Sequence, residues 1–165
     1  PTRRSSDLHM PKLNDKNRYA AEVFDSILGG GMSSRLFQEI REKRGLCYAI
    51  KSHLEQSKDY SYLLIYSGTV KEKVEEIKKL ALKEVKKLGE LKKSDFEEAK
   101  ERLIGLRKIS KEKSDSTMIE LLQEELGGDA KRYYEYENEV GKVKLEDVRA
   151  LSKFKEYSFV ALVPE

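Results

Sequence analysis

The stretch CYAIKSHLEQSKDYSYLLIYS, residues 47–67, decides the fold expected from this sequence. Its two halves, 47–56 and 60–67, are rich in Tyr, Leu and Ile, which are residue types that favour strands. A short polar connection, 57–59, separates the halves, and this arrangement predicts a β-hairpin. Near the end of the chain, residues 157–163 alternate between apolar and polar side chains and predict a closing strand.

Apolar residues at helical spacing surround the hairpin on both sides. The run Gly29-Gly30-Gly31 ends one helix before it, and Gly45 ends a second, shorter helix. After the hairpin, the spacing predicts helices over 70–88, 94–106, 116–126, 130–139 and 145–153. This order favours an α+β fold, in which a small antiparallel sheet, hairpin 47–67 plus closing strand 157–163, packs against several helices.

The first eight residues, PTRRSSDL, stand apart from this pattern. They are polar, lack the apolar segment of a leader peptide and resemble a translated sequencing adapter, so we exclude them from the fold. We therefore expect a non-native leader over 1–8 and a single domain over 9–165. That domain is expected to lack one or more N-terminal strands.

Composition excludes several classes of protein. Among 165 residues, 33 Lys and Arg face 30 Asp and Glu, which leaves a net charge of +3 and no basic surface typical of nucleic-acid binding. No apolar run approaches the roughly 18–20 residues that a membrane span needs. We expect no nucleic-acid partner and no membrane span, and a cytoplasmic location is favoured.

The sequence offers no metal site or nucleophile pair of its own. Its two histidines, His9 and His53, lie far apart, and HxxEH, HExxH and CxxC do not occur. Cys47 and His53 share a predicted strand, but at about 3.3 Å per residue they stand roughly 20 Å apart, too far for a catalytic pair. We expect no metal ligand in this chain and a packing role for Cys47.

The densest candidate cluster follows the glycine run. Arg35, Arg41, Arg44 and Tyr48 lie at a junction between a helix and a strand. The run Gly29–Gly31 lacks the Lys-Ser/Thr of a phosphate-binding P-loop, so we expect it to permit close backbone approach instead. Taken alone, the arginines are equally typical of a helix with basic ends.

The stretch ILGGGMSSRLFQEIREKRGLCY, residues 27–48, resembles the second, inactive-type domain of the pitrilysin/insulinase family of zinc metallopeptidases. The resemblance extends more loosely over 11–165. It implies a pair of homologous α+β domains that face each other across a cavity. The first domain carries the zinc motif HxxEH, and the second closes over the peptide.

The resemblance also implies roles for particular residues. Arg41 and Tyr48, seven positions apart, match an Arg and a Tyr that reach across to the zinc site. The Tyr hydroxyl would donate to the oxyanion, and the Arg would hold substrate carbonyls or a carboxylate. Gly29, Gly30 and Gly31 stand where related non-zinc subunits have a longer, substrate-contacting loop, which implies substrate binding here.

The function implied is that of the substrate-binding half of a zinc metalloendopeptidase. Its zinc lies on a missing first half or on a homologous partner subunit, its substrate is a peptide or polypeptide, and this fragment by itself is expected to be inactive. One alternative is a non-catalytic scaffold of the same fold, like the core subunits of respiratory complexes. Another is an unrelated helical interaction module, which would require the hairpin and the closing strand to be misread.

Overall fold

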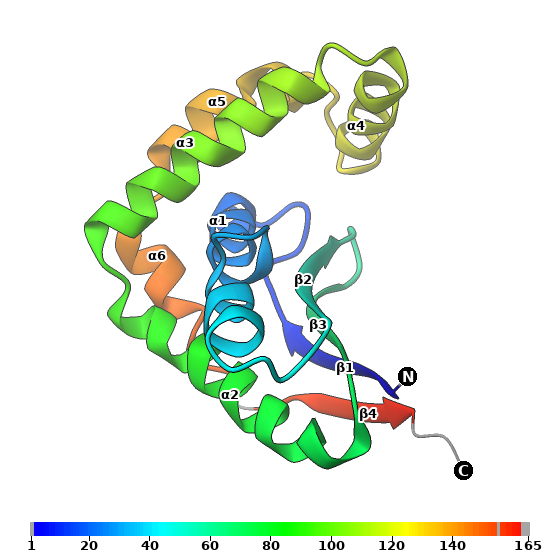
Figure 1. Ribbon diagram of the computed structural model, residues 1–165. Coiled ribbons are helices and arrows are strands. Elements are labelled where there is room, and N and C mark those ends of the chain that lie inside the picture. The colour runs from blue at the N-terminus through cyan, green and yellow to red at the C-terminus, as the bar shows by residue number, and fades with distance from the viewer. Residues whose placement is uncertain (1, 155, 163–165) are drawn as a thin grey trace.

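The computed structural model describes residues 2–154 and 156–162. The chain folds into an antiparallel sheet with helices along one side (Figure 1). For residues 2–8 the structure describes the backbone alone. The described strands are β1 (Thr2–His9), β2 (Ala49–Gln56), β3 (Ser61–Thr69) and β4 (Ser158–Leu162). They lie in the order β2-β3-β1-β4, so β1 occupies the position between the hairpin and the last strand.

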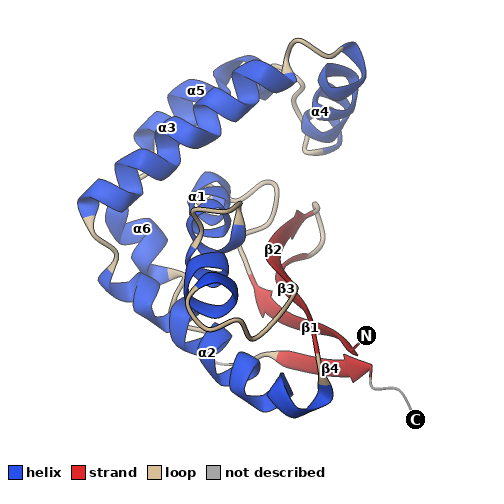
Figure 2. Cartoon of the chain, in the orientation of Figure 1, coloured by secondary structure: helices blue, strands red, loops and turns tan. Residues whose placement is uncertain are grey.

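Helices make up most of the rest of the chain (Figure 2). The α-helices are α1 (Arg18–Gly29), α2 (Val74–Lys87), α3 (Lys93–Ser110), α4 (Ser114–Leu126), α5 (Arg132–Lys142) and α6 (Leu145–Ala150). The shorter elements are a π-helix, η1 (Phe37–Glu42), and the 3₁₀ turns η2 (Lys71–Lys73) and η3 (Leu88–Glu90). Within the described part of the chain, no helix combines the length and apolar character needed to cross a membrane.

The core lies between α1 and the sheet. Val23, Phe24 and Leu28 are fully buried on α1, because their spacing of one and four residues puts them on one helical face. Leu63 and Ile65 of β3 are buried on the side of the sheet that faces this helix. We call the sheet, α1 and η1 the body of the molecule.

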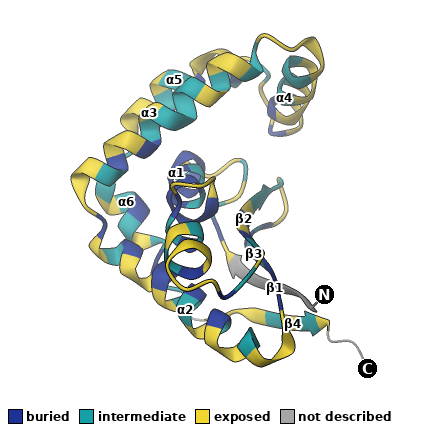
Figure 3. Ribbon diagram, viewed as in Figure 1, coloured by how far each residue is buried: buried dark blue, intermediate teal, exposed yellow. Residues whose placement is uncertain are grey.

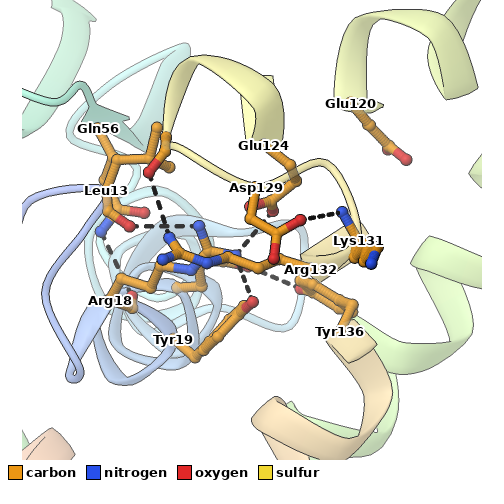
Figure 4. Close-up of polar contacts among 12 residues, drawn as sticks. Leu13, Arg18, Tyr19, Gln56, Glu120, Glu124, Asp129, Lys131, Arg132 and Tyr136 are labelled. Carbon is orange, nitrogen blue, oxygen red and sulfur yellow. Dashed lines mark hydrogen bonds and ion pairs between the residues drawn. The ribbon is translucent and has the colours of Figure 1, made fainter. Parts of the chain in front are cut away.

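Helices α3, α4 and α5 form what we call the arm. Buried apolar residues of α3 and α5, such as Phe96 and Val140, belong to the common core (Figure 3). Polar groups also join the arm to the body (Figure 4). Arg18 of α1 forms an ion pair of 2.7 Å with Glu124 of α4. The hydroxyl of Tyr136 on α5 donates a hydrogen bond of 2.7 Å to Glu22 of α1. Within α4 the buried residue is Glu124, whereas its large apolar side chains Met118, Ile119, Leu122 and Leu126 are exposed.

The α+β class and the small antiparallel sheet predicted from the sequence are confirmed. The predicted hairpin agrees with β2 and β3 to within two residues at each end. The predicted closing strand 157–163 corresponds to β4, although residue 163 lies outside the described residues.

The sheet differs from the expectation in one respect, because a strand does precede the hairpin. Thr2–His9, mostly within the segment set aside as a leader, forms β1 and pairs with both β3 and β4. Antiparallel pairing uses backbone N–H and C=O groups, so a polar segment pairs without any apolar alternation. The division into a leader over 1–8 and a domain over 9–165 stays a prediction, and residue 1 lies outside the described residues.

Candidate functional site

Arg41 lies in an unusual helix. Over Phe37–Glu42 the backbone forms a π-helix, in which the N–H of Lys43 donates to the carbonyl of Gln38 at 3.0 Å, five residues back. Single π turns of this kind occur frequently at functional sites. The sequence predicts a short helix here, and the structure adds its wider turn.

The side chain of Arg41 is exposed and is held by an aromatic neighbour. Its guanidinium carbon stands 4.7 Å from the centre of the Phe37 ring, within the range of a cation–π contact. This contact orients the guanidinium on the surface, and among the described residues its N–H groups have no hydrogen-bond acceptor.

Tyr48 stands where the chain enters β2. Its backbone N–H donates to the carbonyl of Gly68 on β3 at 3.1 Å, and 57% of the residue is exposed. The phenol ring lies close to Gly68: a Cβ added there would stand 2.3 Å from the ring carbon that bears the hydroxyl. Gly68 therefore positions Tyr48, because any side chain at residue 68 would displace the ring.

The sequence analysis missed Gly68, although a signal for it exists. A glycine inside a strand weakens that strand, and it often marks the close approach of another group. Gly68 is such a residue in a segment otherwise rich in Tyr, Leu and Ile.

Cys47 stands between Arg41 and Tyr48 in the sequence, where the chain passes from η1 into β2. Burial raises the pKa of the Cys47 thiol, while a hydrogen bond with Ser67 and the charges of Arg41 and Lys73 oppose that rise. Cys47 is half-buried and packs against the core, in agreement with its predicted packing role.

The other two arginines of the cluster have structural partners. Arg35 lies 3.8 Å from Glu84 and 3.6 Å from Asp95, so it ties the start of η1 to α2 and α3. Arg44 forms an ion pair of 3.0 Å with Glu39. Hydrogen bonds from Lys43 and Arg44 lower the pKa of Glu39 to about 2.

The glycine run permits close backbone approach, as predicted. A Cβ at Gly29 would stand 2.2 Å from the backbone nitrogen of Ser52, so α1 ends directly against β2. Gly31 has a φ of +138°, a conformation that L side chains rarely adopt. The substrate contact implied for Gly29, Gly30 and Gly31 stays a prediction.

The described residues do not fit a zinc ion. His9 and His53 are both exposed, and no group of three or more His, Cys, Asp or Glu in the described part of the chain could hold a metal. A zinc site of a peptidase needs about three protein ligands.

The fold and the site define an α+β domain with an exposed Arg and Tyr at one end of its sheet and, within the described residues, no metal site of its own. Residues 8–103, more than half of the chain, match the family model described as the peptidase M16 inactive domain. The chain belongs to this family.

Similar proteins carry the name of zinc proteases. The chain is 34% identical over 139 residues to the uncharacterized zinc protease YmxG of Bacillus subtilis, covering 82% of this chain and 34% of YmxG. It is 41% identical over 80 residues to an uncharacterized zinc protease of Rickettsia felis, covering 48% of this chain and 19% of that protein. The chain thus spans about a third or less of these relatives.

Solved structures share the fold. The inactive peptidase domain of a zinc protease from Bordetella parapertussis superposes with a TM-score of 0.85 at 12% identity, covering 99% of this chain and 93% of that chain. A protease from Helicobacter pylori gives 0.84 at 23% identity, covering 99% and 41%. A chain of complex III2 from Candida albicans gives 0.84 at 17% identity, covering 97% and 42%.

Proposed function

We propose that this domain completes the active site of a zinc metalloendopeptidase whose zinc is held by another domain or by a partner subunit. The observation that carries the proposal is the exposed Tyr48, positioned by Gly68, on the same segment as the exposed Arg41 that stacks on Phe37. Two further observations support it. The relatives are named zinc proteases and extend well beyond this chain, while the described residues form no metal site.

The two side chains suit peptide hydrolysis because they are hydrogen-bond donors that face outward. In the proposed role, the Tyr48 hydroxyl donates to the substrate carbonyl oxygen as that oxygen gains negative charge. Arg41 presents a planar set of N–H groups to a neighbouring carbonyl or carboxylate of the peptide. A donor fixed before the reaction acts more strongly in the transition state than in the ground state, which raises kcat.

The test uses this chain assembled with its zinc-bearing half. Tyr48→Phe removes one oxygen and should lower kcat by about tenfold or more, in line with the loss of one oxyanion donor. Zinc content should not change, because Tyr48 holds no metal. Tyr134→Phe is the matched control, since Tyr134 is 72% exposed on the distant α5. Unaltered turnover in Tyr48→Phe would contradict the proposed role.

A second variant tests whether the position of the Tyr48 ring matters. Gly68→Ala keeps Tyr48 intact but places a methyl group where the ring now lies. We expect kcat to fall nearly as far as in Tyr48→Phe. Normal activity in Gly68→Ala would show that the ring position does not matter.

A scaffold role remains the second candidate, because a chain of complex III2 has the same fold. Similarity at 17% identity shows the fold alone, so the fold does not separate the two functions. A stable complex with a zinc-bearing half that binds zinc but hydrolyses no peptide would favour the scaffold.

A further inference from the structure

A cleft lies between the arm and the body, where α4 faces α1 and the end of β2. Its volume is about 380 Å³, and all three helices of the arm contribute to its wall. More carboxyl groups than guanidinium groups line it. The carboxyl groups are those of Glu22, Asp25, Glu55, Glu120 and Glu124, and the guanidinium groups are those of Arg18 and Arg107. The cleft therefore carries an excess of acidic groups.

Three buried polar atoms at this cleft have no hydrogen-bond partner. They are Nε of Arg107, Oε2 of Glu120 and Oε2 of Glu124, and no other buried side-chain nitrogen or oxygen within the described residues lacks a partner. All three residues line the cleft, and Glu124 is only 7% exposed. Buried polar groups of folded proteins are nearly always paired, so three unpaired atoms in one cleft point to a ligand.

The bonds that these residues already make define what the ligand must supply. Oε1 of Glu124 accepts a hydrogen bond of 2.7 Å from Arg18 (Figure 4), and Oε1 of Glu120 pairs with Arg107 at 2.9 Å. Each carboxylate therefore keeps its second oxygen for a further N–H donor. Glu120 and Glu124 are one helical turn apart on the same face of α4, so one group can approach both. The Nε–H of Arg107 needs an acceptor on the same ligand.

Burial around the cleft favours a positively charged ligand. Desolvation raises the pKa of Glu22 and of Asp25, because it disfavours their charged forms. A cation bound in the cleft would offset that cost. No group of three or more His, Cys, Asp or Glu in the described part of the chain could hold a metal ion, so the cation is organic.

An apolar wall lies beside the acidic groups. It consists of Leu54, Leu103 and Leu106, and Leu106 is 54% exposed, so the wall reaches the surface. Basic side chains lay their aliphatic stems along such surfaces while the charged head reaches polar groups. Ligand pockets range from about 300 to about 1,000 Å³, and this cleft lies near the lower end. It therefore has room for one residue of an extended chain rather than for a folded partner.

We propose that the cleft binds one arginine residue of a polypeptide, whose guanidinium donates to Oε2 of Glu120 and of Glu124 while its carbonyl oxygen accepts from Nε of Arg107. Arginine fits better than lysine because its planar set of donors serves two carboxylates at once. The three atoms are screened from solvent, so binding requires α4 to move slightly away from α1. The site uses neither Arg41 nor Tyr48, and it goes beyond the proposed function.

The test measures binding to this chain by itself. A domain of the same extent, from Bordetella parapertussis, has been solved as a separate structure. Two capped tripeptides, acetyl-Gly-Arg-Gly-amide and the same peptide with citrulline in place of arginine, are titrated into the chain and followed by NMR. Citrulline has the shape of arginine without its charge. The arginine peptide should bind, and the citrulline peptide should bind about tenfold more weakly or worse.

A third probe distinguishes a peptide residue from a free amine. Spermidine carries positive charges on an aliphatic chain but has no carbonyl oxygen to accept from Arg107. It should therefore bind more weakly than the arginine peptide. Binding of spermidine as tightly as the arginine peptide would overturn the polypeptide as the source of the cation and identify a free polyamine instead.

A variant of the cleft provides the next arm of the test. Glu120→Gln removes one of the two free carboxylates and should weaken binding of the arginine peptide about tenfold. The matched control is Glu125→Gln, because Glu125 is an exposed residue of the same helix outside the cleft lining. This control should bind as the unaltered chain does. Thermal melting checks that both variants fold.

The unaltered chain supplies a measurement that needs no variant. The Nε–H signal of Arg107 should shift when the arginine peptide binds, because that group gains an acceptor. The Nε–H of Arg149 is the control, since it already donates to the carbonyl of Leu91 at 3.1 Å, and its signal should not move.

Four outcomes would overturn the site in the cleft. These are no binding of the arginine peptide, equal binding of the arginine and citrulline peptides, unchanged binding in Glu120→Gln, and an Arg107 signal that stays in place when the peptide is bound. None of these measurements involves a zinc-bearing half or the turnover of a substrate. This proposal and the proposed function can therefore fail separately.

Discussion

Helix α1 of the body and helix α4 of the arm are stabilised by opposite means. Helix α1 of the body buries apolar side chains such as Phe24 and Leu28 completely. Helix α4 of the arm buries the carboxylate of Glu124 and exposes Met118 and Leu122. Burial of apolar surface is nondirectional and largely insensitive to pH, whereas a buried ion pair depends on both partners. The two regions should therefore respond differently to the same kind of substitution.

The largest effect is expected in the body. Phe24→Ala removes a fully buried ring and leaves a cavity in the core, which should lower the free energy of unfolding by about 3–5 kcal/mol. Denaturation in urea measures the change, and hydrogen exchange should show lost protection throughout α1 and the sheet. A loss below about 1 kcal/mol would mean that the core does not lie where the structure places it.

A smaller effect is expected from the arm. Glu124→Ala leaves the buried guanidinium of Arg18 without its ion-pair partner and should cost about 2–3 kcal/mol. Hydrogen exchange should show the change in α4 and near Arg18, with the sheet still protected. The control on the same helix is Leu122→Ala, which should change stability by at most about 0.5 kcal/mol because Leu122 is exposed. Equal effects of the two variants would contradict the comparison.

The smallest effect is a pH dependence of the contact between arm and body. Burial raises the pKa of Glu22 above its ordinary value of 4.5, so the folded chain holds this proton more tightly than the unfolded chain does. This contribution to stability is complete below pH 4.5 and is lost as pH rises through the folded pKa. Glu22→Gln should therefore be more stable than the unaltered chain at high pH, with no such gain at pH 4.

Glu39 in the body provides a control, because its pKa shift has the opposite sign to that of Glu22. The pKa of Glu39 is lowered to about 2 by Lys43 and Arg44, so its contribution is present above pH 4.5 and is lost as pH falls toward 2. Glu39→Gln should be less stable than the unaltered chain at pH 7 and equal to it near pH 2. Unfolding curves in urea over this pH range test both variants, and the same sign for the two would contradict the assignment.

The sequence predicts most of the elements because their periods are strong. The alternation in β2 and β3 and the helical spacing in α1 and α2 come from side chains that the core buries. The sequence of strand β1 has no such period, and yet the strand pairs with β3 on one edge and with β4 on the other. Sequence periodicity reports side chains, whereas strand pairing uses backbone groups that every residue type except proline supplies in full.

The candidate residues of the site come from the sequence, whereas their geometry comes from the structure. The seven-residue interval from Arg41 to Tyr48 is visible in the sequence, and a family resemblance singled it out. The stacking on Phe37 and the support from Gly68 depend on tertiary contacts between separate segments. The buried Glu124 of the arm was missed for a related reason, since it is indistinguishable in sequence from the charged residues of a solvated helix face.

The π turn at Phe37–Glu42 has a consequence for how this segment tolerates changes of length. A π turn closes over five residues where an α turn closes over four, so it holds one residue more than a regular helix. Deleting one residue between Phe37 and Arg41 would turn this segment into a regular α turn and leave the chain beyond it in place, because the wider turn accommodates the extra residue. Arg41 would then lie three positions after Phe37 instead of four, on the same face of the helix. This segment should therefore tolerate the loss of one residue better than a regular helix would.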